Sequence, residues 1–127
     1  MRKKVLLVDD EVLQLELLTE ILGRKNYEVY PASSVLQAQG LLEKVHCDIL
    51  ITDIRMPGMS GIELVKWIKI KNPSLLHRTI VTTGDSCNPR LLEYLQEESL
   101  KVVMKPYNVR HLLALIEEKL VSPAKYN

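Results

Sequence analysis

The sequence of 127 residues has few cysteines, no surplus of either charge and no long hydrophobic run. Its two cysteines, Cys47 and Cys87, lie far apart and show neither a CxxC pair nor a Cys/His spacing. This spacing argues against a disulfide scaffold or a zinc site and makes a reducing cytoplasm the simplest setting. The 17 Lys and Arg residues nearly balance the 16 Asp and Glu residues, giving a formal net charge of +1. Nucleic-acid-binding domains usually carry a basic excess, so direct nucleic-acid binding is not indicated.

The sequence also lacks a targeting or membrane-spanning segment. Arg2–Lys4 precede an apolar run at Val5–Val8, but Asp9 ends that run, and a signal peptide needs a longer one. No stretch approaches the roughly 20 apolar residues that span a membrane. Because hydrophobic residues make up 46% and charged residues 26% of a chain of ordinary domain length, we expect one soluble domain over residues 1–121. Residues 122–127 are expected to form a short polar tail or the start of a linker.

Short apolar runs alternate with longer segments of helical periodicity along the chain. Five runs predict buried strands at Val5–Val8, Glu28–Ala32, Ile49–Thr52, Thr79–Thr83 and Val102–Met104. Apolar residues at helical spacing predict helices over Glu11–Arg24, from Ser33 or Ser34 to Val45, over Ile62–Lys71, around Leu91–Leu95, and from Val109 to Leu120. Asn72-Pro73 is expected to end the third of these helices.

Strands that are apolar without alternation are typical of a parallel sheet covered on both faces. With right-handed crossovers, the five strand–helix units predict an α/β fold: a doubly wound, five-stranded parallel sheet with five helices. In such folds, ligands bind outside the carboxyl ends of the strands. The residues that directly follow each strand are therefore the candidates for chemistry.

Three aspartates, a hydroxyl group and one lysine occupy these positions. Asp9 and Asp10 follow the first predicted strand, Asp53 follows the third, Thr83 ends the fourth and Lys105 follows the fifth. Three neighbouring carboxylates repel one another unless a cation compensates their charge. Oxygen ligands of this kind suit Mg²⁺, which commonly joins one or two carboxylates to a phosphate. The lysine adds a fixed positive charge, and the threonine can donate a hydrogen bond to a phosphoryl oxygen.

No glycine-rich phosphate-binding loop accompanies these groups, since neither GxGxxG nor GxxxxGKS/T occurs in the sequence. A nucleotide site is therefore not indicated. The most economical interpretation is that one aspartate is itself the phosphate acceptor. Carboxylates serve as covalent nucleophiles in phosphoryl transfer, where catalysis consists mostly of positioning and charge neutralisation.

Four segments carry a resemblance to a known family. They are VLLVDDE at Val5–Glu11, ITDIRMPGMSGIEL at Ile51–Leu64, VTTGD at Val81–Asp85 and MKPY at Met104–Tyr107. In this order and at these spacings, the chain resembles the receiver domain of bacterial two-component response regulators from about Lys4 to Leu120. The resemblance implies the flavodoxin-like receiver fold with strand order 2-1-3-4-5. It also implies a signalling switch rather than an enzyme that acts on a metabolite.

The resemblance assigns Asp53 as the phosphoacceptor, which takes a phosphoryl group from a histidine kinase or a phosphotransfer protein. Asp10 is then a direct ligand of Mg²⁺, for which Mn²⁺ can substitute, and Asp9 is an indirect ligand through water. The carboxylate of Asp53 and the backbone carbonyl of Arg55 complete the protein ligands.

The resemblance also implies a switching mechanism. Lys105 is expected to contact the phosphoryl group, Thr83 to swing towards it, and the Lys105–Pro106 peptide bond to be cis. Receivers commonly carry Tyr or Phe three residues before this lysine, and the inward turn of that ring accompanies the threonine movement. This chain has Val102 there, which cannot make the same rotamer change, so its signalling motion is expected to differ or to be weaker. Tyr107 stands at another position and is not the missing switch residue.

Two further expectations concern regulation and partners. Arg55 and Asp85 occupy variable positions that tune dephosphorylation in the family: Asp85 could orient or repel water, and Arg55 could shield the phosphoryl group. The surface of residues 89–120 corresponds to the family's face for partner binding and dimerisation. An output domain, an effector protein or a second copy is therefore expected there, and Leu115, which lies off the main apolar stripe, is a candidate contact.

Two other classes of function compete with a phosphorylation switch. A receiver that no longer signals could serve as a constitutive protein-binding scaffold. Val102 favours this reading, whereas the complete set of aspartates, threonine and lysine argues against it. A small Mg²⁺-dependent phosphatase with an aspartyl nucleophile would need a second aspartate two residues after Asp53, where this chain has Arg55, and a cap domain, for which the chain has no room.

Overall fold

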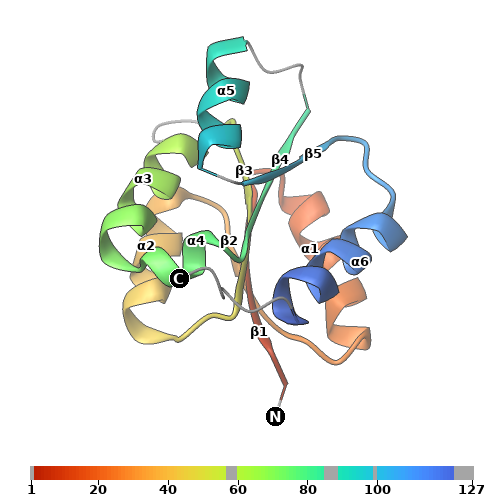
Figure 1. Cartoon of the computed structure of the whole chain (residues 1–127). Helices are drawn as coiled ribbons and strands as arrows, with labels where there is room; N and C mark the ends of the chain where they lie inside the picture. Colours follow the sequence, from red (N-terminus) through yellow and green to blue (C-terminus); the bar gives the residue numbers. More distant parts are fainter. Residues whose placement is uncertain (1, 57–59, 85–88, 99, 122–127) are drawn as a thin grey trace.

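The computed structural model describes residues 2–56, 60–84, 89–98 and 100–121. Its strands are β1 (Lys4–Val8), β2 (Glu28–Ala32), β3 (Ile49–Asp53), β4 (Thr79–Thr83) and β5 (Lys101–Met104). Its helices are α1 (Val12–Arg24), α2 (Val35–Lys44), α3 (Gly61–Lys71), α4 (Pro73–Leu76), α5 (Pro89–Glu97) and α6 (Val109–Val121). The strands form one parallel sheet in the order β2-β1-β3-β4-β5 (Figure 1). The predicted fold class and strand order are confirmed.

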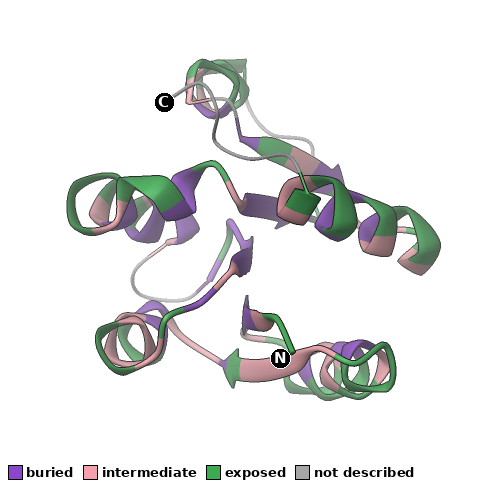
Figure 2. Cartoon of the chain, turned by 60° about the horizontal axis from the view of Figure 1, so that its bottom comes forward, coloured by how far each residue is buried: buried purple, intermediate pink, exposed green. Residues whose placement is uncertain are grey.

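Helices cover both faces of this sheet (Figure 2). Successive side chains of a strand point to opposite faces, so β1 contributes to two separate hydrophobic clusters. Leu6 and Val8 pack with residues of α2, α3, α4 and α5, whereas Val5 and Leu7 pack with residues of α1 and α6. Because the central strands are buried on both faces, their sequences read as continuous apolar runs rather than as alternating patterns.

The structure corrects the predicted number of helices, because α4 is a sixth one among the described residues. Asn72-Pro73 does end α3, but Pro73 also begins the single turn of α4. Proline is well suited to the first position of a helix, where its missing N–H has no partner to lose. The turn is stabilised by burial of Leu75 and Leu76 and by a hydrogen bond from the Thr79 hydroxyl to the Leu75 carbonyl oxygen at 2.8 Å.

The expectation that Leu115 belongs to a partner face is wrong. Its side chain is only 5% exposed and lies in the cluster between the sheet and the α1/α6 layer. α6 buries Leu112, Leu115 and Ile116 together, so its buried face is wider than the single stripe read from the sequence.

Gly61, the first residue of α3, lies directly against the end of β3. A Cβ atom at this position would be 2.3 Å from the Asp53 carbonyl oxygen and 2.8 Å from the Ile54 Cα. The Gly61 N–H also donates to the Ile54 carbonyl oxygen at 3.0 Å. The backbone of Asp53 therefore lies so close to Gly61 that no side chain fits at position 61.

We expect Gly61→Ala to lower the free energy of unfolding by about 2 kcal/mol, because backbone atoms of Asp53 and Ile54 must move away. Gly40→Ala is the matched control. Gly40 lies inside α2, and a Cβ there meets no atom within 4 Å, so this change should stabilise the protein by about 1 kcal/mol. Urea unfolding of both variants measures the difference, and equal stabilities would contradict the close contact at Gly61.

Cys47 is a buried thiol, 1% exposed, in the cluster that faces α2–α5. Burial raises the pKa of this thiol from its ordinary 9.0 to about 11, and the charge of Asp48 adds to the effect. The folded state therefore holds this proton more tightly than the unfolded state. The resulting contribution to stability is complete below pH 9 and is lost as the pH rises towards 11.

We predict that Cys47 in a Cys87→Ser variant resists a thiol reagent at pH 8, where about one thiol in a thousand would be ionised at a pKa of 11. The same variant unfolded in urea should react completely within the time that leaves the native protein unlabelled. Rapid labelling of the native protein would contradict the burial of this side chain.

Candidate functional site

The carboxyl ends of β1, β3, β4 and β5 meet at one edge of the sheet. These strands are consecutive neighbours in the sheet, so the residues that end or directly follow them are brought together although they are far apart in the sequence. Asp9 and Asp10 follow β1, Asp53 ends β3, Thr83 ends β4 and Lys105 follows β5. The strand order therefore brings these groups to one edge of the sheet, as the sequence predicted.

Three carboxylates form the acidic cluster of the site. One oxygen from each of Asp9, Asp10 and Asp53 lies within 4.8 Å of the others. Asp9 is 3% and Asp53 6% exposed, while Asp10 is half-buried. A set of only oxygen donors at these separations fits the coordination chemistry of Mg²⁺. These three residues are the ones that could hold such an ion.

The ammonium group of Lys105 lies among the carboxylates. Its Nζ is 2.9 Å from Asp9 Oδ2, 3.3 Å from Asp53 Oδ2 and 3.3 Å from Glu11 Oε1. Burial alone would lower the pKa of this lysine, but the hydrogen bond to Asp9 and the charges of Asp53 and Asp9 outweigh burial and raise it. Lys105 is therefore a permanently charged group fixed against the Asp53 carboxylate.

The carboxylate of Asp53 is held from two sides. Oδ2 accepts from Lys105, and Oδ1 lies 3.4 Å from the backbone N–H of Arg55, a long hydrogen bond. Burial raises the pKa of Asp53, the positive charge of Lys105 and the Arg55 N–H oppose this, and the charge of Asp9 adds to it. The group is thus a largely buried aspartate with one oxygen near the Arg55 N–H and the other near the Lys105 ammonium group.

Asp9 and Asp10 differ in their surroundings. Asp9 Oδ1 accepts from the Glu11 N–H at 2.9 Å and Asp9 Oδ2 accepts from Lys105, so hydrogen bonds from the protein occupy both oxygens. Asp10 is the more exposed of the two. The pair is therefore asymmetric, with Asp9 buried and hydrogen-bonded and Asp10 half-buried, although one oxygen of each lies in the cluster with Asp53.

The remaining predicted site residues are placed as follows. Thr83 is buried, and its carbonyl oxygen accepts from the Lys105 N–H at 2.7 Å, next to a Lys105–Pro106 bond that is cis as expected. The Arg55 residue is exposed. Val102 is half-buried and packs against the cluster that faces α5. Asp85 lies outside the described residues.

Glu11 is a site residue that the sequence reasoning missed. It appeared there only as part of a motif, whereas its carboxylate contacts the ammonium group of Lys105 across 94 positions of the sequence. Its position directly after Asp9 and Asp10 was the feature of the sequence that could have indicated a place in the site. Glu11 is the N-cap residue of α1, which begins at Val12.

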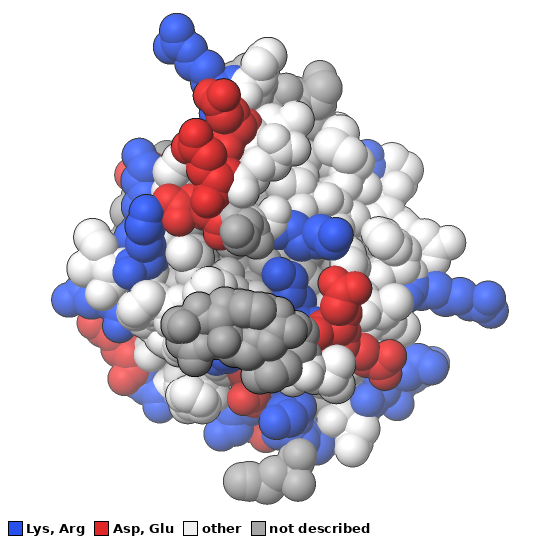
Figure 3. All heavy atoms as spheres, viewed as in Figure 1, with Lys and Arg blue, Asp and Glu red and all other residues white. Residues whose placement is uncertain are grey.

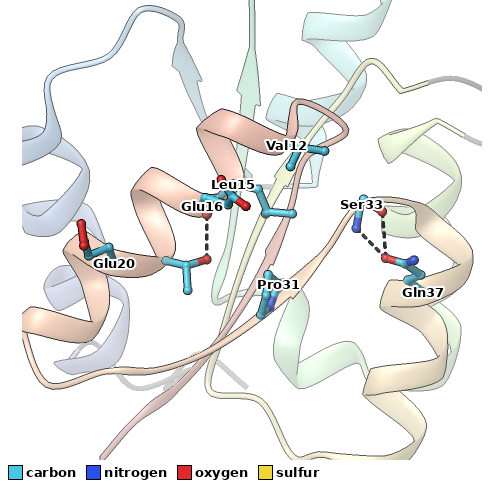
Figure 4. A pocket seen from close by; sticks show the side chains of 8 residues that line it. Val12, Leu15, Glu16, Glu20, Pro31, Ser33 and Gln37 are labelled. Atoms are coloured by element: carbon cyan, nitrogen blue, oxygen red, sulfur yellow. Dashed lines mark hydrogen bonds between the residues drawn. The ribbon is translucent and has the colours of Figure 1, made fainter.

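A separate groove lies on the other side of α1 and contains none of the predicted site residues. It measures about 460 Å³ and is lined by Val12, Leu15, Glu16, Thr19, Glu20, Pro31, Ser33 and Gln37 (Figure 4). Ser33 and Gln37 hydrogen-bond each other at its margin. The acidic cluster, not this groove, is therefore the candidate site.

The surface shows charges of both signs. On the face seen in Figure 3, aspartate and glutamate side chains form a strip in the upper part of the view, where α5 lies, while lysine and arginine side chains are scattered over the rest. None of the described helices is long and apolar enough to cross a membrane.

The model of the response regulator receiver domain family matches residues 5–117, which include every residue of the site described above. The chain is therefore a member of the response regulator receiver domain family, the signalling modules of two-component systems.

Individual relatives agree with this. Sporulation initiation phosphotransferase F of Bacillus subtilis is 28% identical over the whole chain and is itself covered to 99%. The response regulator protein PilR of Pseudomonas aeruginosa is 31% identical over 94% of this chain, which spans only 26% of PilR. A CheY-like receiver domain protein from Methanospirillum hungatei JF-1 has a similar structure, with a TM-score of 0.90, 28% identity and full coverage of both chains.

We expect Asp10→Asn to raise the free energy of unfolding without added metal, by on the order of 1 kcal/mol, because it removes one of several crowded negative charges. In the wild type, Mg²⁺ should raise the melting temperature, because it binds only the folded protein. In Asp10→Asn this rise should be largely lost. Thermal melts in chelator and in Mg²⁺ measure both effects.

Glu20→Gln on α1 is the control for the charge change, since Glu20 is exposed and lies outside the acidic cluster. It should respond to Mg²⁺ as the wild type does. An Asp10→Asn variant with the full response to Mg²⁺ would argue against a metal site at these carboxylates.

Proposed function

We propose that this chain accepts a phosphoryl group on Asp53 and changes conformation as a result, acting in the cytoplasm as the receiver of a phosphorelay. The donor is a phosphohistidine of a sensor kinase or of a phosphotransfer protein. The observation that carries the proposal is the Asp53 carboxylate, which lies 3.3 Å from a permanently charged lysine and within 4.8 Å of two further carboxylates. The name of the Bacillus subtilis relative, a phosphotransferase, supports the same chemistry.

In the proposed reaction, an Asp53 oxygen attacks the phosphorus atom of the donor. A P–O bond forms as the P–N bond breaks, and the electron pair returns to the imidazole nitrogen. Lys105 is positioned to neutralise a phosphoryl oxygen during this transfer. A Mg²⁺ ion held by Asp10, Asp53 and the Arg55 carbonyl would supply further charge neutralisation. Asp9, with both oxygens already hydrogen-bonded, suits an indirect role through water.

The chain's own groups therefore catalyse its phosphorylation and, with water, its dephosphorylation, while no external metabolite is the substrate. The set of charged contacts argues against a constitutive scaffold, since Lys105 and the three aspartates retain close mutual geometry. Arg55 and Asp85 are proposed to set the lifetime of the phosphoryl group.

The conformational response is proposed to start at Thr83, whose hydroxyl would donate to the phosphoryl group. Its backbone carbonyl is already bonded to the Lys105 N–H, so a shift at Thr83 reaches β5. Val102 on β5 packs in the same cluster as Leu95 of α5. A change in the packing of this pair replaces the ring movement that an aromatic residue would make.

The surface that binds a partner is proposed to be the face of residues 89–120. Leu92 on α5 and Met104 at the end of β5 are large apolar side chains, 37% and 48% exposed. The fold buries neither side chain, so each is available for contact with a partner. An output domain, an effector protein or a second copy would bind there.

Incubation with Mg²⁺ and acetyl phosphate should add one phosphoryl group, about 80 Da, to the wild type. Asp53→Asn should add none, because an amide cannot act as the nucleophile, and chelation of Mg²⁺ should abolish the addition to the wild type. Intact mass spectrometry measures the adduct.

Asp48→Asn is the matched control. Asp48 precedes β3 at the opposite end of this strand, where it accepts from the Lys4 N–H at 2.8 Å, so this variant should be phosphorylated like the wild type. A wild type that neither gains the adduct nor binds beryllofluoride in the presence of Mg²⁺ would overturn the proposed function.

A further inference from the structure

Two hydrogen bonds join the start of α1 to the segment that follows β5. Glu11, the residue before α1, accepts from Lys105 Nζ at 3.3 Å, and Gln14 Nε2 donates to the Tyr107 hydroxyl at 2.7 Å. Residues three apart face the same side of a helix. One side of the start of α1 therefore contacts two residues after β5: the ammonium group of Lys105 and the hydroxyl of Tyr107.

The ring of Tyr107 is anchored in the core. It packs against the cluster that lies between the sheet and the α1/α6 layer. Burial raises the pKa of its hydroxyl, and the hydrogen bond from Gln14 and the charge of Lys105 oppose this. The hydroxyl is thus neutral at ordinary pH and is available as the acceptor of the Gln14 amide.

The Gln14–Tyr107 hydrogen bond lies at an open groove. A groove of about 480 Å³ lies between α1 and the segment from Lys105 to Val109, and Glu11, Gln14, Lys105 and Tyr107 are among its lining residues. Because side chains do not fill this groove, the Gln14–Tyr107 hydrogen bond adds to the packing of the Tyr107 ring in holding the segment beside α1.

We propose that Gln14 and Tyr107 are positioning residues for Lys105 in phosphoryl transfer. Their hydrogen bond holds the backbone after β5 against α1, so that the ammonium group stays between Asp9 and Asp53. Small displacements of a catalytic group cost rate even when binding is unchanged. This inference rests on the proposed function, because it concerns the rate at which Asp53 is phosphorylated.

The test compares Gln14→Leu, Tyr107→Phe and the double variant with the wild type, all as the full chain. The rate of phosphorylation by acetyl phosphate at saturating Mg²⁺ is followed by intact mass, and the Mg²⁺ dissociation constant is measured by calorimetry. Each single variant should react about fivefold more slowly, because each removes the same hydrogen bond. The double variant should be no slower than the singles, and Mg²⁺ affinity should stay within about twofold of the wild type.

Tyr27→Phe is the matched control, since the Tyr27 ring packs against the same cluster but does not contact Gln14 or Lys105 in any hydrogen bond among the described residues. It should react at the wild-type rate. Wild-type rates in Tyr107→Phe, multiplied losses in the double variant, or a loss of Mg²⁺ affinity equal to the loss of rate would each overturn the inference. A wild type that takes up no phosphoryl group and binds no beryllofluoride would instead overturn the proposed function itself.

Discussion

The arrangement of the whole sheet edge depends on one ammonium group. Lys105 donates to Asp9, Asp53 and Glu11 at 2.9–3.3 Å, and Asp10 adds a further carboxylate nearby. Four carboxylates face one lysine, so negative charge exceeds positive charge at this edge. Such an imbalance is unfavourable for the isolated fold, and it suits the divalent cation of the proposed function, whose charge would offset the carboxylates when a phosphoryl group is added. The lysine reduces the repulsion enough for the carboxylates to stay close without removing the need for a further cation.

The parallel sheet explains why these groups meet. Each of the strands β1, β3 and β4 is almost entirely buried between two helical layers, so the charged side chains in these strands stand only at a first or last position. Crossover connections bring all carboxyl ends to the same edge. The strand β3 serves both the core and the site. Its first four residues are buried in the core, and its last residue is Asp53. Gly61 then contacts the backbone of this aspartate.

The parts of the fold and site that depend on local pattern were predictable from the sequence. Continuous apolar runs indicated the strands, and the polar residues after them indicated Asp9, Asp10, Asp53, Thr83 and Lys105. Features that depend on packing between distant segments were not. α4 was missed because Pro73 both ends one helix and begins the next. Leu115 was misassigned because the width of the buried face of α6 depends on how the helix sits against its neighbours.

Glu11 and Gln14 were missed for a similar reason. Both are polar residues near the start of an amphipathic helix, where the ordinary expectation is a solvated side chain. Their partners, Lys105 and Tyr107, lie more than 90 positions away in the sequence, and no periodicity within α1 reports such a contact. Only the placement of α1 beside the segment after β5 makes these residues part of the site.

The contacts of Lys105 also matter for the proposed signalling, because this chain has Val102 where receivers commonly carry Tyr or Phe. Lys105 is connected in three directions: to Asp53 through its ammonium group, to Thr83 through its backbone N–H, and to α1 through Glu11. In the proposed function, a phosphoryl group on Asp53 would bring new negatively charged oxygens that compete with Asp9 and Glu11 for this ammonium group. A shift of Lys105 would then reach β4 through its backbone N–H and the α5 side of the sheet through Val102, which lies in the strand directly before Lys105. If the proposed function holds, redistribution of hydrogen bonds around Lys105 would initiate the response that the resemblance assigns to a rotating aromatic ring, which Val102 cannot provide.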